Sequence, residues 1–172
     1  MGYVPDYFEA RIGKWMAAGW LPPSGKIADF GLQEFHGDQA EARRVTAEFL
    51  RRYDVPDSQV EQICSPVRAL SVADVYRALG HEYVAIDMQQ TKTVHFFDLN
   101  CFAPPDESCM SFDMVNNEGV IEHLINPING FLIAHELLRV GGVAVHSIPL
   151  SGHANQWVDA PDNEVLRSAP AC

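Results

Sequence analysis

Four short apolar runs of the sequence each end near a side chain with carboxylate or amide oxygens. Asp29, Asp87 and Asp98 follow three of these runs, and Asn117 closes a fourth. Ligands of open parallel sheets bind outside the carboxyl ends of the strands, so these side chains are expected to meet at one edge. Carboxylates there can accept hydrogen bonds from ribose hydroxyls and attract a positive group. The pattern indicates a site for a nucleoside with a positive centre.

The turn after the first run bears on which nucleoside would fit. Gly31 allows the backbone to approach a ligand closely, but residues 32–34 (LQE) hold no further glycine. A pyrophosphate prefers a glycine-rich turn without acids nearby, and the G-x-G-x-x-G fingerprint of nicotinamide-dependent enzymes is absent. Each acid taken alone also fits an ordinary turn. Their joint placement on one edge favours ligand binding.

Metal and thiol chemistry are not indicated. The chain has four cysteines and no C-x-x-C pair, so neither a zinc site nor a thioredoxin-type redox site is expected. Residues 135–139 (HELLR) fail the H-E-x-x-H pattern of zinc proteases, because the fifth residue is Arg. We therefore predict no metal site.

The composition excludes several classes of partner. The chain has 172 residues, 12 of them basic and 23 acidic, and its formal net charge is −11. This charge disfavours phosphate backbones and anionic membrane surfaces, so neither nucleic acid nor a membrane is an expected partner. No stretch approaches the roughly 18 apolar residues of a membrane helix, and the acidic start (MGYVPD) does not resemble a signal peptide. We expect a cytoplasmic protein that binds a small molecule.

Helical and strand-like segments alternate along the chain. Helices are expected at about 8–16, 38–53, 57–64, 71–79 and 126–140. Strands are expected at about 26–31, 82–87, 93–98, 112–117 and 143–148. The strands are nearly continuous apolar runs, which is typical of strands covered by helices on both faces. We therefore predict an α/β fold, a three-layer α/β/α sandwich with a mainly parallel sheet of about five strands.

Two helices carry predictions about their faces. The last one is expected to begin after Asn126 and to end just before Gly141, with Arg139 near its negative end. Its expected inner face comprises Ile128, Phe131, Leu132, His135 and Leu138.

The helix at 38–53 places a third of the basic residues on one face. A local anion site is one interpretation, and a solvated face balanced by Glu41 and Glu48 is the one that we favour. The arginines are Arg43, Arg44, Arg51 and Arg52.

Five motifs follow one another along the predicted sheet. They are 29–34 (DFGLQE), 83–87 (YVAID), 97–99 (FDL), 112–124 (FDMVNNEGVIEHL) and 137–142 (LLRVGG). In order and character they resemble class I S-adenosylmethionine-dependent methyltransferases, which have a Rossmann-like fold. The resemblance covers residues 26–149, about 124 of the 172 positions.

The resemblance implies a binding site for S-adenosylmethionine. It assigns the methionine part of this cofactor to the first motif, the ribose to the end of the second, the adenine to the third, and the methyl group to the loop after the fourth. The implied cofactor-binding residues are Asp29, Gly31, Gln33, Asp87, Met88, Asp98, Leu99 and Asn117.

His123 is the one candidate for a catalytic residue, as a general base near the end of the fourth strand. A histidine that packs or caps in a loop is the other interpretation. Methyl transfer need not use a base, because positioning can supply much of the rate.

The segment order departs from the family in two places. Asp29 and Asp87 are 58 positions apart, so a helical insertion is expected at about 38–80. The strand-helix pattern ends after the fifth strand, and we expect residues after about Gln156 to be a truncated or altered end of a longer parent domain. An exposed fifth strand would invite pairing with a second copy of the chain. The predicted regions are a helical cap (1–25), the cofactor domain (26–150) and an irregular tail (151–172).

The predicted function is methyl transfer from S-adenosylmethionine to a small-molecule or sugar-like acceptor. A methyltransferase-like domain that binds without catalysing is the alternative, and the glycine-poor turn favours it. A nicotinamide-dependent oxidoreductase is less compatible with the sequence, because its glycine fingerprint is missing.

Overall fold

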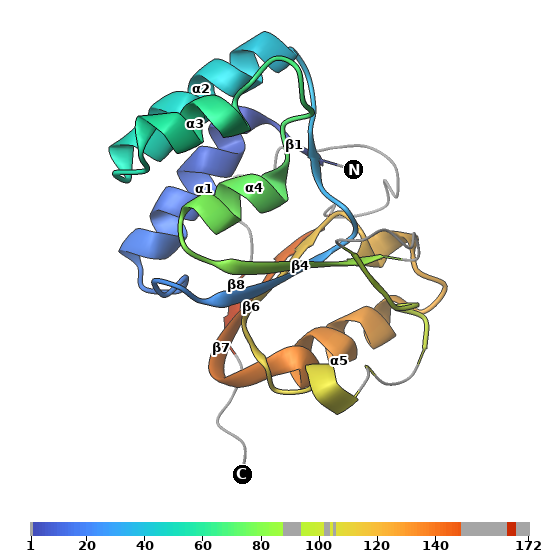
Figure 1. The fold of residues 1–172 in the computed structure, drawn as a ribbon. Coiled ribbons are helices and arrows are strands. Elements are labelled where there is room, and N and C mark those ends of the chain that lie inside the picture. Colours follow the sequence, from blue (N-terminus) through green and yellow to red (C-terminus); the bar gives the residue numbers. More distant parts are fainter. Residues whose placement is uncertain (1, 88–93, 102–103, 105, 149–164, 168–172) are drawn as a thin grey trace. The chain divides into compact units, whose positions relative to one another are not determined.

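The chain folds into two compact units (Figure 1). The structure is a computed structural model, and it describes residues 2–87, 94–101, 104, 106–148 and 165–167. The sheet unit comprises residues 26–32 and the chain from Val84 onward. The helical unit comprises residues 2–25 and 33–83, so that the N-terminal segment and the insertion after the first long strand form one unit.

The sheet unit is built on six strands. They are β2 (Lys26–Phe30), β4 (Glu82–Asp87), β5 (Val94–Phe96), β6 (Phe112–Glu118), β7 (Leu138–Ser147) and β8 (Val165–Arg167). Across the sheet their order is β5-β4-β2-β6-β7-β8. Strand β2 is central. β4 and β5, which follow it in the chain, lie on one side, and β6 and β7 lie on the other, which is the strand order of a doubly wound sheet. The pairs β4–β5, β2–β6 and β6–β7 are parallel, so the predicted α/β fold with a mainly parallel sheet is confirmed.

Helix α5 (Pro127–Leu137) lies along one face of this sheet (Figure 1). Ala28, Val115 and Ala144 are partners in register on three neighbouring strands, and they belong to one buried cluster with Ile133 of α5. Burying a side chain of the size of Ile133 stabilises a fold by about 1.5–3 kcal/mol. This cluster therefore fixes the helix on the strands that carry the candidate site.

The predicted inner face is buried only in part: Leu138 belongs to the core cluster and Phe131 packs against it, but the other three residues are exposed. Ile128 and Leu132 are 69% and 54% exposed, and His135 is also exposed. The cause is close packing at one position: a Cβ on Gly130 would lie only 2.7 Å from Ile121 Cγ1, so the side of the helix that carries this glycine is the one that can face Ile121. The buried residues of the helix are Asn129, Gly130, Ile133, Ala134 and Leu137.

The same helix ends earlier than predicted. It stops at Leu137, and β7 begins at once, so Leu138 and Arg139 belong to the strand. The Ser111 N–H donates to the Leu137 carbonyl at 3.0 Å, which draws the chain into the sheet. Arg139 forms an ion pair with Asp113 instead of meeting the end of a helix.

The edge beyond β7 also differs from the prediction. Val143, Ala144 and Val145 pair with β8 in antiparallel register. The expectation that the fifth long strand is an open edge is therefore wrong at these three positions. The segment expected to be an irregular tail contributes this one short strand, and no second strand is described there.

The helical unit packs four helices with two short strands. They are β1 (Gly2–Tyr3), α1 (Pro5–Ala17), β3 (Glu34–Phe35), α2 (Gln39–Arg52), α3 (Asp57–Ile63) and α4 (Val72–Ala78). Asp38 accepts a hydrogen bond from the Ala40 N–H at 2.8 Å and so caps the N-terminus of α2. The ring of Phe8 makes edge contacts with Phe35 and Tyr76, at centroid distances of 5.1 and 5.6 Å. An aromatic cluster thus forms the core of this unit.

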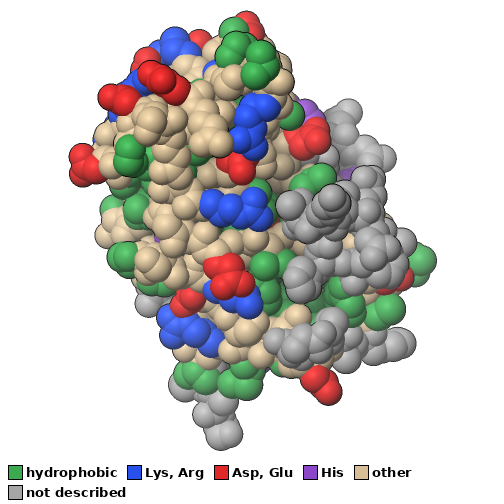
Figure 2. All heavy atoms as spheres, viewed as in Figure 1, with side chains coloured by type: hydrophobic (Ala, Val, Ile, Leu, Met, Phe, Trp, Pro, Cys, Tyr) green, Lys and Arg blue, Asp and Glu red, His purple; other side chains and the backbone are tan. Residues whose placement is uncertain are grey.

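Two of the four arginines of α2 are paired with carboxylates. Arg44 lies 2.6 Å from Glu41 and 2.7 Å from Glu48, and Arg51 lies 2.8 Å from Asp57. Figure 2 shows basic and acidic side chains intermixed over this part of the surface. The favoured interpretation, a solvated and balanced face, is confirmed for these residues.

Candidate functional site

The carboxyl ends of β2 and β6 form the point at which the strand order of the sheet reverses. Ligands of open α/β sheets bind at such switch points, where successive connections leave in different directions. Most of the predicted site residues belong to this end of the sheet. Asp29, Gly31, Asp87, Asp98 and Asn117 lie at the ends of its strands or in the turns that follow.

Asp29 is part of a buried polar pair. It is the register partner of Asn116, whose Nδ2 donates to Asp29 Oδ1 at 2.7 Å, and both side chains are completely buried. A buried carboxylate requires such donors, because burial without them is costly. Asp29 is thus held by the sheet itself, directly behind the turn that follows β2.

That turn is joined to the end of β4 by two hydrogen bonds. The Gly31 N–H donates to the Ile86 carbonyl at 2.8 Å, and the Leu32 N–H donates to Asp87 Oδ2 at 2.8 Å. Gly31 has a φ of +76°, a left-handed conformation that glycine adopts without strain. Gly31, predicted to allow close approach of a ligand, and Asp87, predicted to bind the ribose, are therefore held together by hydrogen bonds.

The loop after β5 is anchored to the segment around α5. Asp98 Oδ1 accepts hydrogen bonds from the backbone N–H and Nδ2 of Asn100, both at 2.9 Å. Asn100 Oδ1 in turn accepts from the Ile125 N–H at 2.9 Å, and Asn129 Nδ2 donates to the Leu99 carbonyl at 2.9 Å. The side chain of Leu99 is buried in the core cluster, whereas Asp98 stays partly exposed.

Asn117 combines a structural and an available hydrogen-bonding group. Its Oδ1 accepts from the N–H groups of Val120 and Ile121, at 3.0 and 2.9 Å, at the start of the short 3-10 helix η2 (Ile121–His123). Its Nδ2 is buried and has no hydrogen-bond partner in the part of the chain that is described. A buried, unsatisfied donor is costly, so any acceptor that reached this amide would be stabilised.

Two carboxyl groups and a histidine lie around η2. Glu118 ends β6 and is buried, and Glu122 is half-buried. Burial raises the pKa of the Glu122 carboxyl and Glu118 raises it further, against the opposing effects of a backbone hydrogen bond and His123. His123 itself is exposed. Its imidazole is therefore accessible from solvent.

Charge is distributed unevenly over the sheet unit. Among the side chains described there, the only Lys and Arg are Lys26 and Arg139, and both lie at the amino ends of strands. The carboxyl ends instead carry Asp87, Asp98 and Glu118. A field of this sign favours a cationic ligand and opposes a phosphate.

Two predicted cofactor residues lie outside the described part of the sheet unit. Met88 lies outside the described residues. Gln33 is buried, but it belongs to the helical unit.

Two polar residues of the sheet were not predicted as part of the site. Asn116 holds Asp29, and His146 of β7 is the register partner of Asn117. The His146 ring packs against Phe131 with centroids 4.7 Å apart, and burial lowers its pKa to about 4. The signal that would have found both is a polar side chain inside an otherwise apolar strand.

A search against protein-family models and against curated proteins found no match to this chain. None of the described helices is both long enough and apolar enough to cross a bilayer. The described residues also contain no group of three or more His, Cys, Asp and Glu side chains arranged to hold a metal ion. Function has to be argued from the site, since a fold alone does not define it.

Proposed function

We propose that the chain is an S-adenosylmethionine-dependent methyltransferase that acts on a small-molecule or sugar-like acceptor. One observation carries the proposal: at the switch point, a turn at Gly31 is bonded to Asp87, on an edge with carboxylates and, among the described side chains, no Lys or Arg. This combination favours a nucleoside with a positive sulfur over a nucleotide with a pyrophosphate.

The residues of the edge have complementary roles in this proposal. A carboxylate offers about four acceptor positions, so Asp87 can accept from ribose hydroxyls beside the Leu32 N–H. Asp98 faces the adenine amine, and the buried amide of Asn117 donates toward the cofactor near its methyl group. The Asp29 carboxyl group supports the start of the turn through its hydrogen bond with Asn116.

When bound, the cofactor supplies a methyl group that its positive sulfur has already activated. The chain therefore has mainly to orient the acceptor and exclude water. His123 is the candidate base for an acceptor that must lose a proton. The three-layer arrangement of the fold and cofactor contacts by Gln33, Met88 and Leu99 belong to the same proposal.

A methyltransferase-like module that binds without catalysing is the second candidate. The observation that favours it is that Asn117 Oδ1 and the Asp29 carboxylate are already used in internal hydrogen bonds. A nicotinamide-dependent oxidoreductase has less support, since the edge offers neither a glycine-rich turn nor a described cation for the pyrophosphate.

Calorimetric titration of the purified protein distinguishes these functions. We expect S-adenosylmethionine and S-adenosylhomocysteine to bind and NAD not to bind. Methyl transfer from labelled cofactor to any member of a panel of small alcohols, amines and sugars supports the enzyme. Binding without transfer to any of them favours the second candidate, and failure of both adenosyl compounds to bind contradicts both.

The variant Asp87→Asn tests the site directly. It keeps an oxygen acceptor for the Leu32 N–H but removes the charge that the ribose hydroxyls would meet. Hydrogen bonds to charged groups contribute about 1.5–3 kcal/mol, so we expect cofactor affinity to fall about tenfold or more. Asp106→Asn, at an exposed position of the 3-10 helix η1 (Asp106–Ser108), is the matched control. Equal affinities for the two variants would contradict the role of Asp87.

A further inference from the structure

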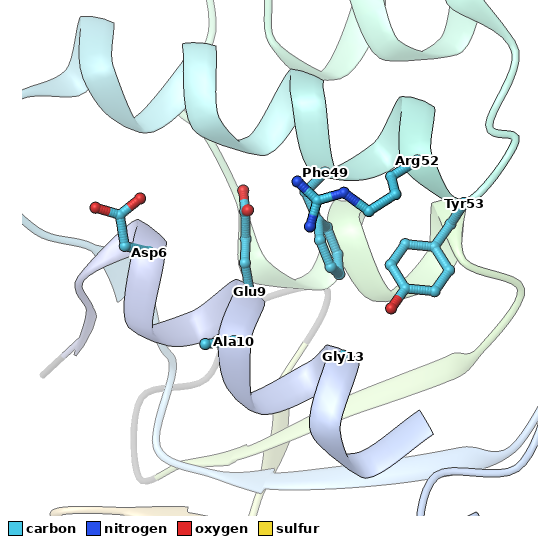
Figure 3. A pocket seen from close by; sticks show the side chains of 7 residues that line it. All are labelled: Asp6, Glu9, Ala10, Gly13, Phe49, Arg52 and Tyr53. Carbon is cyan, nitrogen blue, oxygen red and sulfur yellow. The ribbon is translucent and has the colours of Figure 1, made fainter. Parts of the chain in front are cut away.

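The helical unit contains a hollow between α1 and the end of α2, with a volume of about 370 Å³. That volume is within the range of sites for small molecules. Figure 3 shows that its walls come from both helices. The lining residues are Asp6, Glu9, Ala10, Gly13, Phe49, Arg52 and Tyr53.

The floor of the hollow is apolar. Phe49 is almost completely buried, and the ring of Tyr53 packs on it at a centroid distance of 4.9 Å. Gly13 makes room for this ring, because a Cβ at Gly13 would lie 3.2 Å from the Tyr53 hydroxyl. The partly exposed ring of Tyr53, supported by Phe49 beneath it, therefore offers a surface for a short aliphatic chain.

The polar groups of the hollow have opposite charges on its two sides. Asp6 and Glu9 come from α1, and Arg52 comes from the end of α2. In Figure 3 the Glu9 carboxyl extends toward α2, and the Arg52 guanidinium turns back toward it. No ion pair joins these two groups in the described structure, although the charge of Arg52 acts on Glu9. A ligand with a cation at one end and an anion at the other matches this arrangement.

Glu9 and Arg52 are not satisfied by the described protein. Glu9 Oε1 is buried and accepts no hydrogen bond from any residue that the structure describes. The Arg52 side chain is exposed and has no hydrogen bond or ion pair within the described ranges, whereas the side chains of Arg44 and Arg51 are paired with carboxylates. Burial is also the main reason that the pKa of Glu9 is raised to about 7. An unsatisfied buried oxygen of this kind favours a donor, and a cationic one most strongly.

We propose that this hollow binds a small dipolar molecule, with an ammonium group at Glu9, a carboxylate at Arg52 and a short aliphatic chain on the ring of Tyr53. The site is contained in the helical unit and does not depend on the function proposed for the sheet unit.

Calorimetry with a graded set of probes tests the proposal. The probes are glycine, β-alanine, 4-aminobutanoate and 6-aminohexanoate, and the single-charge analogues are butylamine and butanoate. We expect at least one of the dipolar probes to bind, and more tightly than either analogue. Absence of binding by all four at millimolar concentration overturns the site, as does equal binding of butylamine.

Two variants and a matched control locate the binding. Glu9→Gln and Arg52→Gln should each weaken binding of the best probe about tenfold or more, because each removes one charge-assisted hydrogen bond. Arg51→Gln removes the same charge from the neighbouring position, where the side chain is paired with Asp57, and should leave the affinity unchanged. Equal effects of the two arginine variants would contradict a specific site.

The pH dependence of probe affinity separates a binding role of Glu9 from a purely structural one, because a purely structural role would not change it. Charged groups that act on Glu9 are Asp6 on α1 and Arg44, Glu48 and Arg52 on α2. Because the ammonium requires the ionised carboxyl, apparent affinity should fall about tenfold between pH 8 and pH 6. Glu9→Gln should abolish this dependence, and an unchanged pH profile in that variant overturns the role of Glu9.

Discussion

Each unit of the molecule contains a titratable side chain that is removed from water. His146 is buried in the sheet unit, and Glu9 is half-buried in the helical unit. Burial lowers the pKa of the histidine to about 4 and raises the pKa of the glutamate to about 7. Both shifts have the same main cause, since a low-dielectric environment disfavours the charged form of either group. The two units therefore respond to pH in opposite directions, because protonation destabilises one and deprotonation destabilises the other.

The two units also differ in how their polar groups are used. At the carboxyl edge of the sheet, Asp87 and Asn117 hold the backbone of neighbouring loops through hydrogen bonds of 2.8–3.0 Å. In the hollow of the helical unit, Glu9 and Arg52 hold nothing that the structure describes. A preorganised edge keeps its geometry without a ligand, whereas the hollow gains its missing partners only when one binds.

The largest expected effect concerns His146. An unfolded histidine takes up a proton near pH 6.5, but the folded one does so only near pH 4. The stability from its neutral form is thus complete above pH 6.5 and is lost as the pH falls toward 4. We expect the unfolding free energy of the wild type to fall by about 3 kcal/mol over this range, and that of His146→Leu not to show this loss. Urea unfolding at each pH measures both.

The exposed histidine of α5 is the control for this measurement. His135→Gln removes an imidazole that is in contact with solvent, so its unfolding free energy should follow the wild type at every pH. If His146→Leu also follows the wild type, the burial of His146 has no effect on stability.

A smaller effect is expected at the turn after β2, which is hydrogen-bonded to the end of β4. Gly31→Ala places a side chain at a φ of +76°, which costs about 1–2 kcal/mol of unfolding free energy. It should also weaken cofactor binding, because the turn is part of the proposed site. Gly19→Ala introduces the same kind of strain in the helical unit, at a φ of +68° with open space around it. Calorimetry measures the cofactor affinity of both variants. If the affinity fell equally in both, the difference proposed between the sheet unit and the helical unit would be wrong.

The smallest effect is expected at Glu9. Its folded pKa is raised above the unfolded value of 4.5, so the wild type loses stability as the pH rises from 4.5 toward 7. Glu9→Gln should therefore be more stable than the wild type at pH 8 and equal to it at pH 4. Because the side chain is only half-buried, we expect a difference on the order of 1 kcal/mol in urea unfolding. Glu61→Gln, at an exposed position of α3, should show no such difference in stability from the wild type at pH 8.

The strands were predictable because each is a continuous apolar run that ends in a polar residue. The expected strand at 82–87 agrees with β4, and the one at 112–117 differs from β6 by a single residue. The cap at Asp38 was predictable for a similar reason, since its hydrogen bonds are made within one turn of chain. Local patterns decide such features before any tertiary contact forms.

The face and end of α5 were not predictable in this way. Both sides of that helix carry apolar residues, so periodicity alone could not select the buried one. Contact with Ile121 required the small side of the helix at Gly130, and Ile128 was left in solvent. The early end of the helix depends on Ser111, which is distant in the sequence and donates to the carbonyl of its last residue.

The sequence by itself determined the class of fold and the presence of acids at the ends of strands, because hydrophobic periodicity and turn residues act over a few positions. Only the tertiary structure decided how those acids are used. Asn116 meets Asp29, and the Leu32 N–H meets Asp87, across separations of 87 and 55 residues. The hollow at Glu9 likewise exists only because α1 and α2 pack together. Such contacts depend on the pairing of whole elements, which no local pattern of the sequence contains.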